Sequence, residues 1–119
     1  MSEHQVHRCD VAIIGYGPVG QTLAILLAQR GHTVTVVERW PQPYGLPRAV
    51  VLDHEIARTF HSLGISEQVR DIVDINDNYE WRNAAGHTLL KFHTSTIAPS
   101  GWPASVNFCQ PQLEDILDQ

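Results

Sequence analysis

Two short segments near the start of the chain are dominated by apolar and β-branched residues, 10–15 (DVAIIG) and 32–38 (HTVTVVE). Short apolar runs of this kind predict buried strands. Between them, residues 19–30 (VGQTLAILLAQR) repeat apolar side chains at helical spacing, and Gly31 follows where a helix commonly ends. A strand, a helix and a second strand in so short a segment predict a βαβ unit, whose two strands run parallel.

The pattern is more broken in the next part of the chain. Residues 39–52 are rich in Pro and Gly and predict a long loop. Apolar residues at helical spacing then predict a helix over 54–63 with Asp53 as its N-cap. A second short helix is expected over 66–73, with Ser66 as its N-cap. We therefore expect loop and helices over residues 39–75.

Period-two alternation returns in the last third of the chain. Residues 78–82 (NYEWR) and 87–92 (HTLLKF) are separated by NAAG, which predicts a β-hairpin. A Pro- and Gly-rich loop follows over 94–105. Residues 106–109 then predict a strand, and 110–119 predict the beginning of a helix with Pro111 in its first turn.

These elements predict an α/β fold that is Rossmann-like, with a small inserted β-hairpin. Two or three parallel strands are fewer than a complete doubly wound domain contains, so the domain is expected to be incomplete and the chain to be the N-terminal portion of a larger protein. The expected segments are a βαβ unit at 10–38, a loop and helices at 39–75, a β-hairpin at 78–92 and a truncated strand–helix at 105–119.

Composition narrows the classes of function. The 119 residues carry a net charge of −5 and no basic cluster, so nucleic-acid binding is not expected. The polar first ten residues resemble no signal peptide, and no apolar run is long enough to span a membrane. Two cysteines, Cys9 and Cys109, fit free thiols better than a disulfide framework. A cytoplasmic protein that does not bind membranes is expected.

The strongest chemical signal is the G-x-G-x-x-G spacing of Gly15, Gly17 and Gly20 between the first strand and the helix. Gly15 permits the tight turn, Gly17 lets a pyrophosphate approach the backbone, and Gly20 lets the helix pack closely on the strand. The free N–H groups of the helix attract phosphate. Glu38, 18 residues past Gly20, can accept hydrogen bonds from a ribose diol. The motif alone leaves NAD and FAD open and disfavours NADP.

Further segments carry a resemblance to a known family. Residues 11–39, the segment LPRAVVLDHE at 46–55, the triplet GWP at 101–103 and the segment NFCQPQLE at 107–114 stand in the order found in that family. Together they resemble the FAD-dependent aromatic-ring monooxygenases, also called flavoprotein hydroxylases. The choice of FAD over NAD rests on this resemblance.

The resemblance implies roles for particular residues. The pyrophosphate would lie on the glycine turn, Glu38 would hold the adenosine ribose with Arg39 beside it, Arg48 would reach the pyrophosphate, and Gln110 would bind the ribityl region of the flavin. The implied cofactor-binding set is Gly15, Gly17, Pro18, Val19, Gly20, Glu38, Arg39, Arg48 and Gln110. Asp53 matches an acidic position near the flavin, but a plain helix N-cap is favoured. No catalytic residue can be assigned within the chain.

The resemblance also implies a reaction. FAD would be reduced by NADH or NADPH, and a flavin C4a-hydroperoxide formed with O2 would hydroxylate a small phenolic aromatic acid. The alternatives are a polyketide or other FAD hydroxylase of the same superfamily, or a non-catalytic nucleotide-binding fragment; the isolated chain is expected to be inactive. A homodimer of the full-length protein stays open.

Other polar residues give weaker signals. The seven histidines show no metal-ligand spacing, so no metal site is expected. Tyr79 and Trp81 alternate on one strand face, which favours packing over substrate stacking. Trp102 lies between Gly and Pro in the 94–105 loop, and the resemblance places this region near the substrate domain, which implies Trp102 as a candidate for the substrate pocket.

Overall fold

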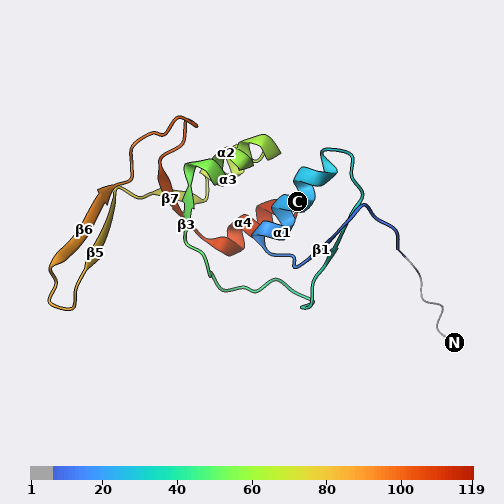
Figure 1. The fold of residues 1–119 in the computed structure, drawn as a ribbon, viewed down its shortest axis with the longest axis horizontal. Helices are drawn as coiled ribbons and strands as arrows, with labels where there is room; N and C mark the ends of the chain where they lie inside the picture. Colours follow the sequence, from blue (N-terminus) through green and yellow to red (C-terminus); the bar gives the residue numbers. More distant parts are fainter. Residues whose placement is uncertain (1–6) are drawn as a thin grey trace.

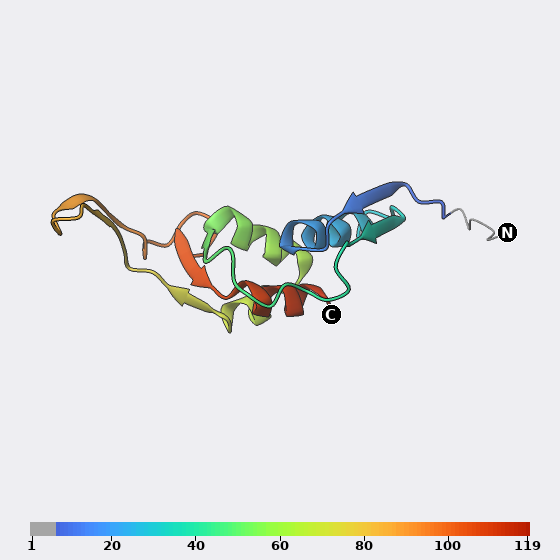
Figure 2. The ribbon, with the colours of Figure 1, turned by 90° about the horizontal axis from the view of Figure 1, so that it is seen from below.

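The computed structural model describes residues 7–119, which extend over 67 × 33 × 21 Å (Figure 1). A strand–helix–strand unit lies at one end, and a small sheet with three helices lies in the middle. A β-hairpin projects at the other end, as the view from below also shows (Figure 2). The elements therefore lie in a row along the longest axis of the molecule.

The first unit contains β1 (Val11–Ile14), α1 (Pro18–Ala28) and β2 (Val34–Val37). β1 and β2 pair in parallel with Val11 opposite Val34, as their apolar pattern predicts. Gly31 follows the helix in the left-handed region, with φ of 86°, where glycine carries no Cβ penalty. The helix thus crosses from the end of one strand to the start of the next.

The middle of the molecule contains an antiparallel sheet with strand order β3-β7-β4. Its strands are β3 (Val51–Asp53), β7 (Ser105–Phe108) and β4 (Val73–Ile75), and its helices are α2 (His54–Leu63), α3 (Ser66–Arg70) and α4 (Gln110–Leu117). One apolar cluster unites these elements, and its buried members are Leu52, Ala57, Phe60, Leu63, Val69, Trp102, Val106, Phe108, Leu113 and Leu117. This cluster fixes α4 beside the first unit.

The structure corrects the predictions for the segment 39–75. The predicted loop ends in β3, and the predicted second helix stops at Arg70, so that Val73 begins β4 instead of ending a helix. Both strands are only three residues long, and their backbone partners come from β7, about 30 to 55 residues further along the chain. β7 pairs antiparallel with both strands in a separate sheet, so it does not add a third strand to the parallel pair of β1 and β2. It spans 105–108, whereas the sequence predicts 106–109.

Ser66 is the first residue of α3 and not its cap. Ile65 occupies the N-cap position, and the Ser66 hydroxyl forms a hydrogen bond with Nδ1 of His61 at 3.1 Å. The Ser66 side chain therefore links α2 to α3 by this hydrogen bond and does not cap the backbone of its own helix.

The hairpin comprises β5 (Asn78–Arg82) and β6 (Thr88–His93) in antiparallel pairing. The rings of Tyr79 and Trp81 lie 6.4 Å apart and those of Tyr79 and Phe92 6.0 Å apart, on one exposed face. These aromatic residues pack on one another across the strands, as their alternation predicts.

Candidate functional site

The glycine turn between β1 and α1 is held against β2. Gly15 has φ of 108°, which favours glycine, and its N–H donates to the carbonyl of Val37 at 2.8 Å. A Cβ placed on Gly20 would lie 2.1 Å from the carbonyl oxygen of Gly15. The helix therefore packs directly on the turn, at a distance that only glycine permits.

Gly17 has the opposite surroundings. No atom lies within 4 Å of a Cβ built on this residue, so open space begins directly beside its backbone. Gly17 is the N-cap of α1, and no side chain caps the helix there. The first N–H groups of a helix have no partner within the helix and carry partial positive charge. The N-terminal end of α1, with its N–H donors, and the open space beside the Gly17 backbone therefore lie next to each other.

The carboxylate of Glu38, directly after β2, faces the same turn. It accepts hydrogen bonds from the backbone N–H of Tyr16 at 2.8 Å and of Trp40 at 3.0 Å. The hydrogen bond from Tyr16, followed by that from Trp40, lowers the pKa of Glu38 below its usual 4.5. The group is ionised at neutral pH, and a carboxylate retains further acceptor capacity for hydroxyl groups.

Helix α4 closes the site from the other side. The Tyr16 hydroxyl donates to Oδ1 of Asp118, and this hydrogen bond raises the pKa of Tyr16 above 10. Glu114 is buried, and its Oε1 lies 3.7 Å from a guanidinium nitrogen of Arg48. The glycine turn and the loop between β2 and β3 are therefore both attached to α4.

Gln110, at the start of α4, holds that loop in place. Its Oε1 accepts from the backbone N–H of Ala49 at 3.0 Å and of Arg48 at 3.3 Å, and its Nε2 donates to Glu114 at 2.7 Å. Only 4% of Gln110 is exposed. The sequence suggests a ligand-binding glutamine at this position, whereas the contacts within the chain fix the backbone on either side of Arg48.

A cavity of about 330 Å³ lies where these groups meet. Its lining combines the glycine turn, the loop after β2 and one face of α4, and consists of Tyr16, Gly17, Glu38, Trp40, Pro41, Gln42, Pro43, Tyr44, Arg48, Glu114 and Asp118. A second cavity of about 460 Å³, between α1 and α2, is almost wholly apolar and holds no charged group. Of these two cavities, the first is the one lined by charged groups and by Gly17 of the glycine turn, and it is the candidate site.

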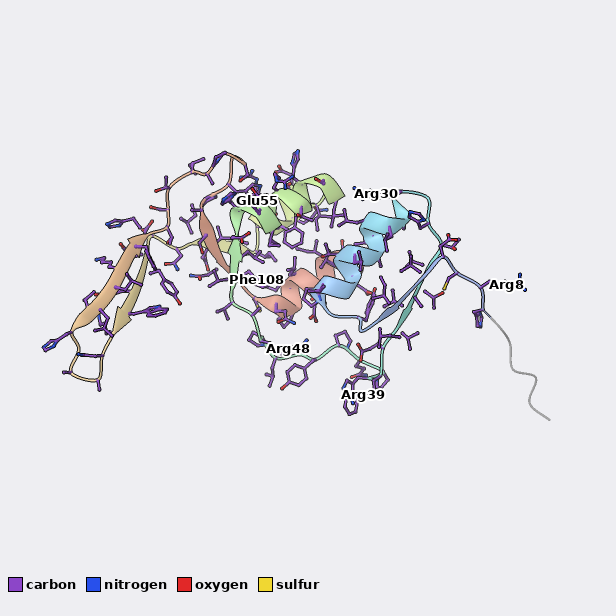
Figure 3. The ribbon with its side chains drawn as sticks, in the orientation of Figure 1. Arg8, Arg30, Arg39, Arg48, Glu55 and Phe108 are labelled. Atoms are coloured by element: carbon purple, nitrogen blue, oxygen red, sulfur yellow. The ribbon has the colours of Figure 1, made fainter. Side chains whose placement is uncertain are left out.

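The structure brings some of the predicted site residues together, whereas Pro18 and Val19 line the second, apolar cavity. Gly17, Glu38 and Arg48 line the cavity of the candidate site, Gly15 and Gly20 form the close contact between the turn and α1, and Gln110 binds the backbone of Arg48. Figure 3 shows Arg39 and Arg48 on the same long loop, along one edge of the molecule. Pro18 and Val19 begin α1, and Val19 is 82% exposed, so that turn of the helix is accessible.

Other lining residues were missed by the sequence reasoning. Tyr16 and Asp118 are 102 positions apart, and nothing in the sequence pairs them. Glu114 could have been found, because it lies four residues after Gln110 and therefore on the same face of a helix. Trp40 and Tyr44 lie in the Pro-rich loop, where an aromatic side chain has no periodicity to mark its direction.

Two side candidates from the sequence have structural roles instead. Oδ1 of Asp53 accepts from the backbone N–H of Glu55 at 3.0 Å and of Ile56 at 2.9 Å, which confirms it as the N-cap of α2. Trp102 is 3% exposed and belongs to the apolar core, with the Arg70 guanidinium 4.2 Å from its ring. Within the described part of the chain, Trp102 therefore packs in the apolar core.

Metal and membrane chemistry receive no support from the described residues. Within residues 7–119, no three His, Cys, Asp or Glu side chains gather in a way that could hold a metal ion. In the same part of the chain, every helix is too short or too polar to cross a membrane.

A fold with a glycine turn, a free helix N-terminus and an acidic residue after the second strand defines a dinucleotide-binding protein. Residues 8–119 match the family described as FAD binding domain, and the chain belongs to that family. This match confirms the resemblance on which the choice of FAD over NAD rested.

Particular relatives are hydroxylases by name. The chain is 41% identical over 110 residues to a probable NADH-specific resorcinol 4-hydroxylase of Rhodococcus jostii, covering 92% of this chain and 21% of the relative. It is 38% identical over 108 residues to a 3-(3-hydroxy-phenyl)propionate/3-hydroxycinnamic acid hydroxylase of Comamonas testosteroni, covering 91% and 18%. The chain thus spans about a fifth of the length of these relatives.

Solved structures show the same fold. The flavin-dependent monooxygenase PieE, in complex with FAD and substrate, matches with a TM-score of 0.74 and 25% identity, over 94% of this chain and 21% of its own. The p-nitrophenol 4-monooxygenase PnpA of Pseudomonas putida matches with a TM-score of 0.77 and 22% identity, over 90% and 27%. The α/β fold of this chain is that of FAD-dependent monooxygenases.

Proposed function

We propose that the chain is the N-terminal, incomplete portion of a Rossmann-like FAD-binding domain with an inserted β-hairpin. The whole protein is then an NAD(P)H-dependent flavoprotein monooxygenase. The observation that carries the proposal is the cavity that unites the glycine turn, Glu38 and Arg48. Family membership supports FAD as its ligand.

The residues around the cavity fit an ADP moiety. The open space beside Gly17 would let phosphate oxygens approach the first N–H groups of α1, whose start has no side-chain cap. The ionised Glu38 accepts from the ribose hydroxyls and would repel a 2′-phosphate, which favours FAD over a cofactor with that group.

Arg48 supplies the positive charge that the pyrophosphate requires. Arg48 lines the cavity, its side chain is more than half exposed, and a guanidinium nitrogen lies 3.7 Å from Glu114. A guanidinium can fork onto phosphate oxygens. Gln110 positions Arg48 by holding its backbone, and the second hydrogen of its amide would be the donor to the ribityl chain of the flavin.

Bound FAD supplies the redox chemistry and the activation of O2. The residues of this chain bind and orient its ADP part. Resorcinol and 3-(3-hydroxyphenyl)propionate, named for the relatives, share a phenolic ring, so the proposed reaction of the whole protein is hydroxylation of a small phenolic compound such as the latter acid. NADH is named for one of these relatives, and NADH or NADPH is the proposed co-substrate.

Titration with FAD tests the proposal. We expect saturable binding, seen as a change in flavin absorbance, and loss of most of the affinity when Arg48 is replaced by alanine. Oxidation of NADH or NADPH by the whole protein, stimulated by 3-(3-hydroxyphenyl)propionate, tests the activity. A protein that fails to bind FAD refutes the proposal, and stimulation by polyketides alone refutes the substrate class.

A non-catalytic nucleotide-binding fragment is the second candidate. It is favoured by the apolar side chains of Ile14 and Val37, which remain exposed at the edge of the two-stranded sheet. FAD binding without any NAD(P)H-dependent hydroxylation by the whole protein would support this candidate instead.

A further inference from the structure

Trp40 is the large aromatic residue nearest in sequence to the carboxylate of Glu38, and it lines the same cavity. Its backbone N–H donates to Oε1 of Glu38 at 3.0 Å. Its side chain is 63% exposed, although an indole is costly to leave in water. The structure thus presents an open aromatic ring two residues from the ribose-binding group.

We propose that the indole of Trp40 is the stacking surface for the adenine of the bound dinucleotide, which makes this pocket selective for a purine base. This inference rests on the proposed FAD-binding function. It assigns a ligand contact to a residue that neither the glycine motif nor the family resemblance singled out.

The covalent structure of a nucleotide supports this placement. The base is attached to the ribose carbon next to the diol, so a diol held by Glu38 fixes the base within a few bonds of that carboxylate. On one side of Glu38 lies the glycine turn, bound through Tyr16, which takes the phosphates. On the other side lies Trp40, bound through its own N–H. The base therefore faces the loop after β2.

The ring of Trp40 is also held in position. The guanidinium carbon of Arg39 lies 4.8 Å from the centroid of the indole and occupies one face by a cation–π contact. Further along the loop, Tyr44 lines the same cavity, with the Arg48 guanidinium 5.1 Å from its ring. A ring fixed on one face loses little freedom when a base stacks on the other.

The chain offers a matched control. Trp81, on β5, is 54% exposed and also sits among aromatic neighbours, but it lies on the projecting hairpin away from the cavity (Figure 1). If exposure alone governed the effect of losing a tryptophan, both substitutions would act alike. If stacking on adenine governs it, only Trp40 matters.

The test is calorimetric titration of the protein with FAD, ADP and inorganic pyrophosphate, for the wild type and for Trp40→Ala, Trp40→Phe and Trp81→Ala. Stacking of a base on an aromatic side chain corresponds to roughly 5- to 150-fold in affinity. We expect Trp40→Ala to lower the affinity for FAD and for ADP at least fivefold, and Trp40→Phe to retain most of the wild-type affinity. The affinity for pyrophosphate should be unchanged in both variants. Trp81→Ala should bind all three ligands as the wild type does.

A spectroscopic readout accompanies the titration. ADP does not absorb tryptophan emission, so any quenching by ADP requires direct contact with an indole. Stacking on Trp40 should therefore quench part of the protein fluorescence, and this quenching should be absent in Trp40→Phe. Unchanged ADP affinity in both Trp40 variants, or quenching retained in Trp40→Phe, overturns the inference while FAD binding stands. A wild type that binds neither FAD nor ADP overturns the proposed function itself.

Discussion

The contact between Gly20 and the glycine turn leads to a sharp prediction about stability. In Gly20→Ala, the new methyl group would meet the carbonyl oxygen of Gly15 at 2.1 Å and its carbon at 3.2 Å. Both obstacles are backbone atoms, so no side chain can rotate away. Helix and turn must separate by about 1 Å to restore an ordinary contact, which also strains the 2.8 Å hydrogen bond from Gly15 to Val37.

The magnitude follows from two opposing effects. Overpacking costs about 1–3 kcal/mol, and a backbone obstacle places this site at the upper end. Alanine is favoured over glycine inside a helix by about 1 kcal/mol. The expected net loss is about 2 kcal/mol of unfolding free energy, or about 8 °C in Tm for a chain of this size.

Urea unfolding, followed by circular dichroism, measures this loss, and Gly17→Ala provides the control. A Cβ on Gly17 meets no atom within 4 Å, and its φ of −85° suits alanine. Gly17→Ala should therefore unfold at the wild-type urea concentration yet bind FAD more weakly, because its methyl group occupies the space beside the phosphates. Equal stability of Gly20→Ala and the wild type, or equal losses in both variants, would refute this reasoning.

Three further predictions concern other contacts. Asp53→Ala should lose about 1 kcal/mol of unfolding free energy in urea by removing the cap of α2, while Asp53→Asn retains most of it; equal losses would contradict the cap. Gln110→Ala should cost about 1–3 kcal/mol and weaken FAD binding on titration, because the N–H groups of Arg48 and Ala49 lose their acceptor; unchanged values for both would contradict this. The hydrogen bond from Arg82, followed by that from Thr88, lowers the pKa of Glu80 from 4.5 to about 2. The ionised Glu80 therefore stabilises the hairpin fully above pH 4.5, and this stabilisation is lost as the pH falls toward 2. NMR of the hairpin amides should follow this loss in the wild type and not in Glu80→Gln, and a pH response equal in both would contradict it.

The first unit was predicted well because its signals are local. Strand, glycine turn and helix follow one another with no long-range partner needed, and the apolar pattern of Val34–Val37 marks β2 directly. β3 and β4 were missed because each has three residues and exists only through its pairing with β7. A pattern over three residues carries no readable period, so the tertiary partner decides their structure.

The site shows the same division. Gly17, Glu38 and Arg48 were predicted and do line one cavity, since motif spacing and resemblance point to each of them. The attachment of the turn to Asp118 through Tyr16 was not predictable, because it depends on where α4 packs. The polar groups of Gln110 were predicted to face a ligand, whereas its Oε1 accepts from the loop and its Nε2 donates to Glu114 on α4.

The hydrogen bonds that close the cavity join residues far apart in the sequence: Arg48 to Gln110 across 62 positions and Tyr16 to Asp118 across 102. During synthesis, the glycine turn leaves the ribosome long before α4 does. At about 5–20 residues per second, the wall formed by α4 follows some 5–20 s after the turn. The nascent βαβ unit therefore exists for that interval without the wall formed by α4, and the hydrogen bond from Tyr16 to Asp118 can form only once residue 118 has emerged.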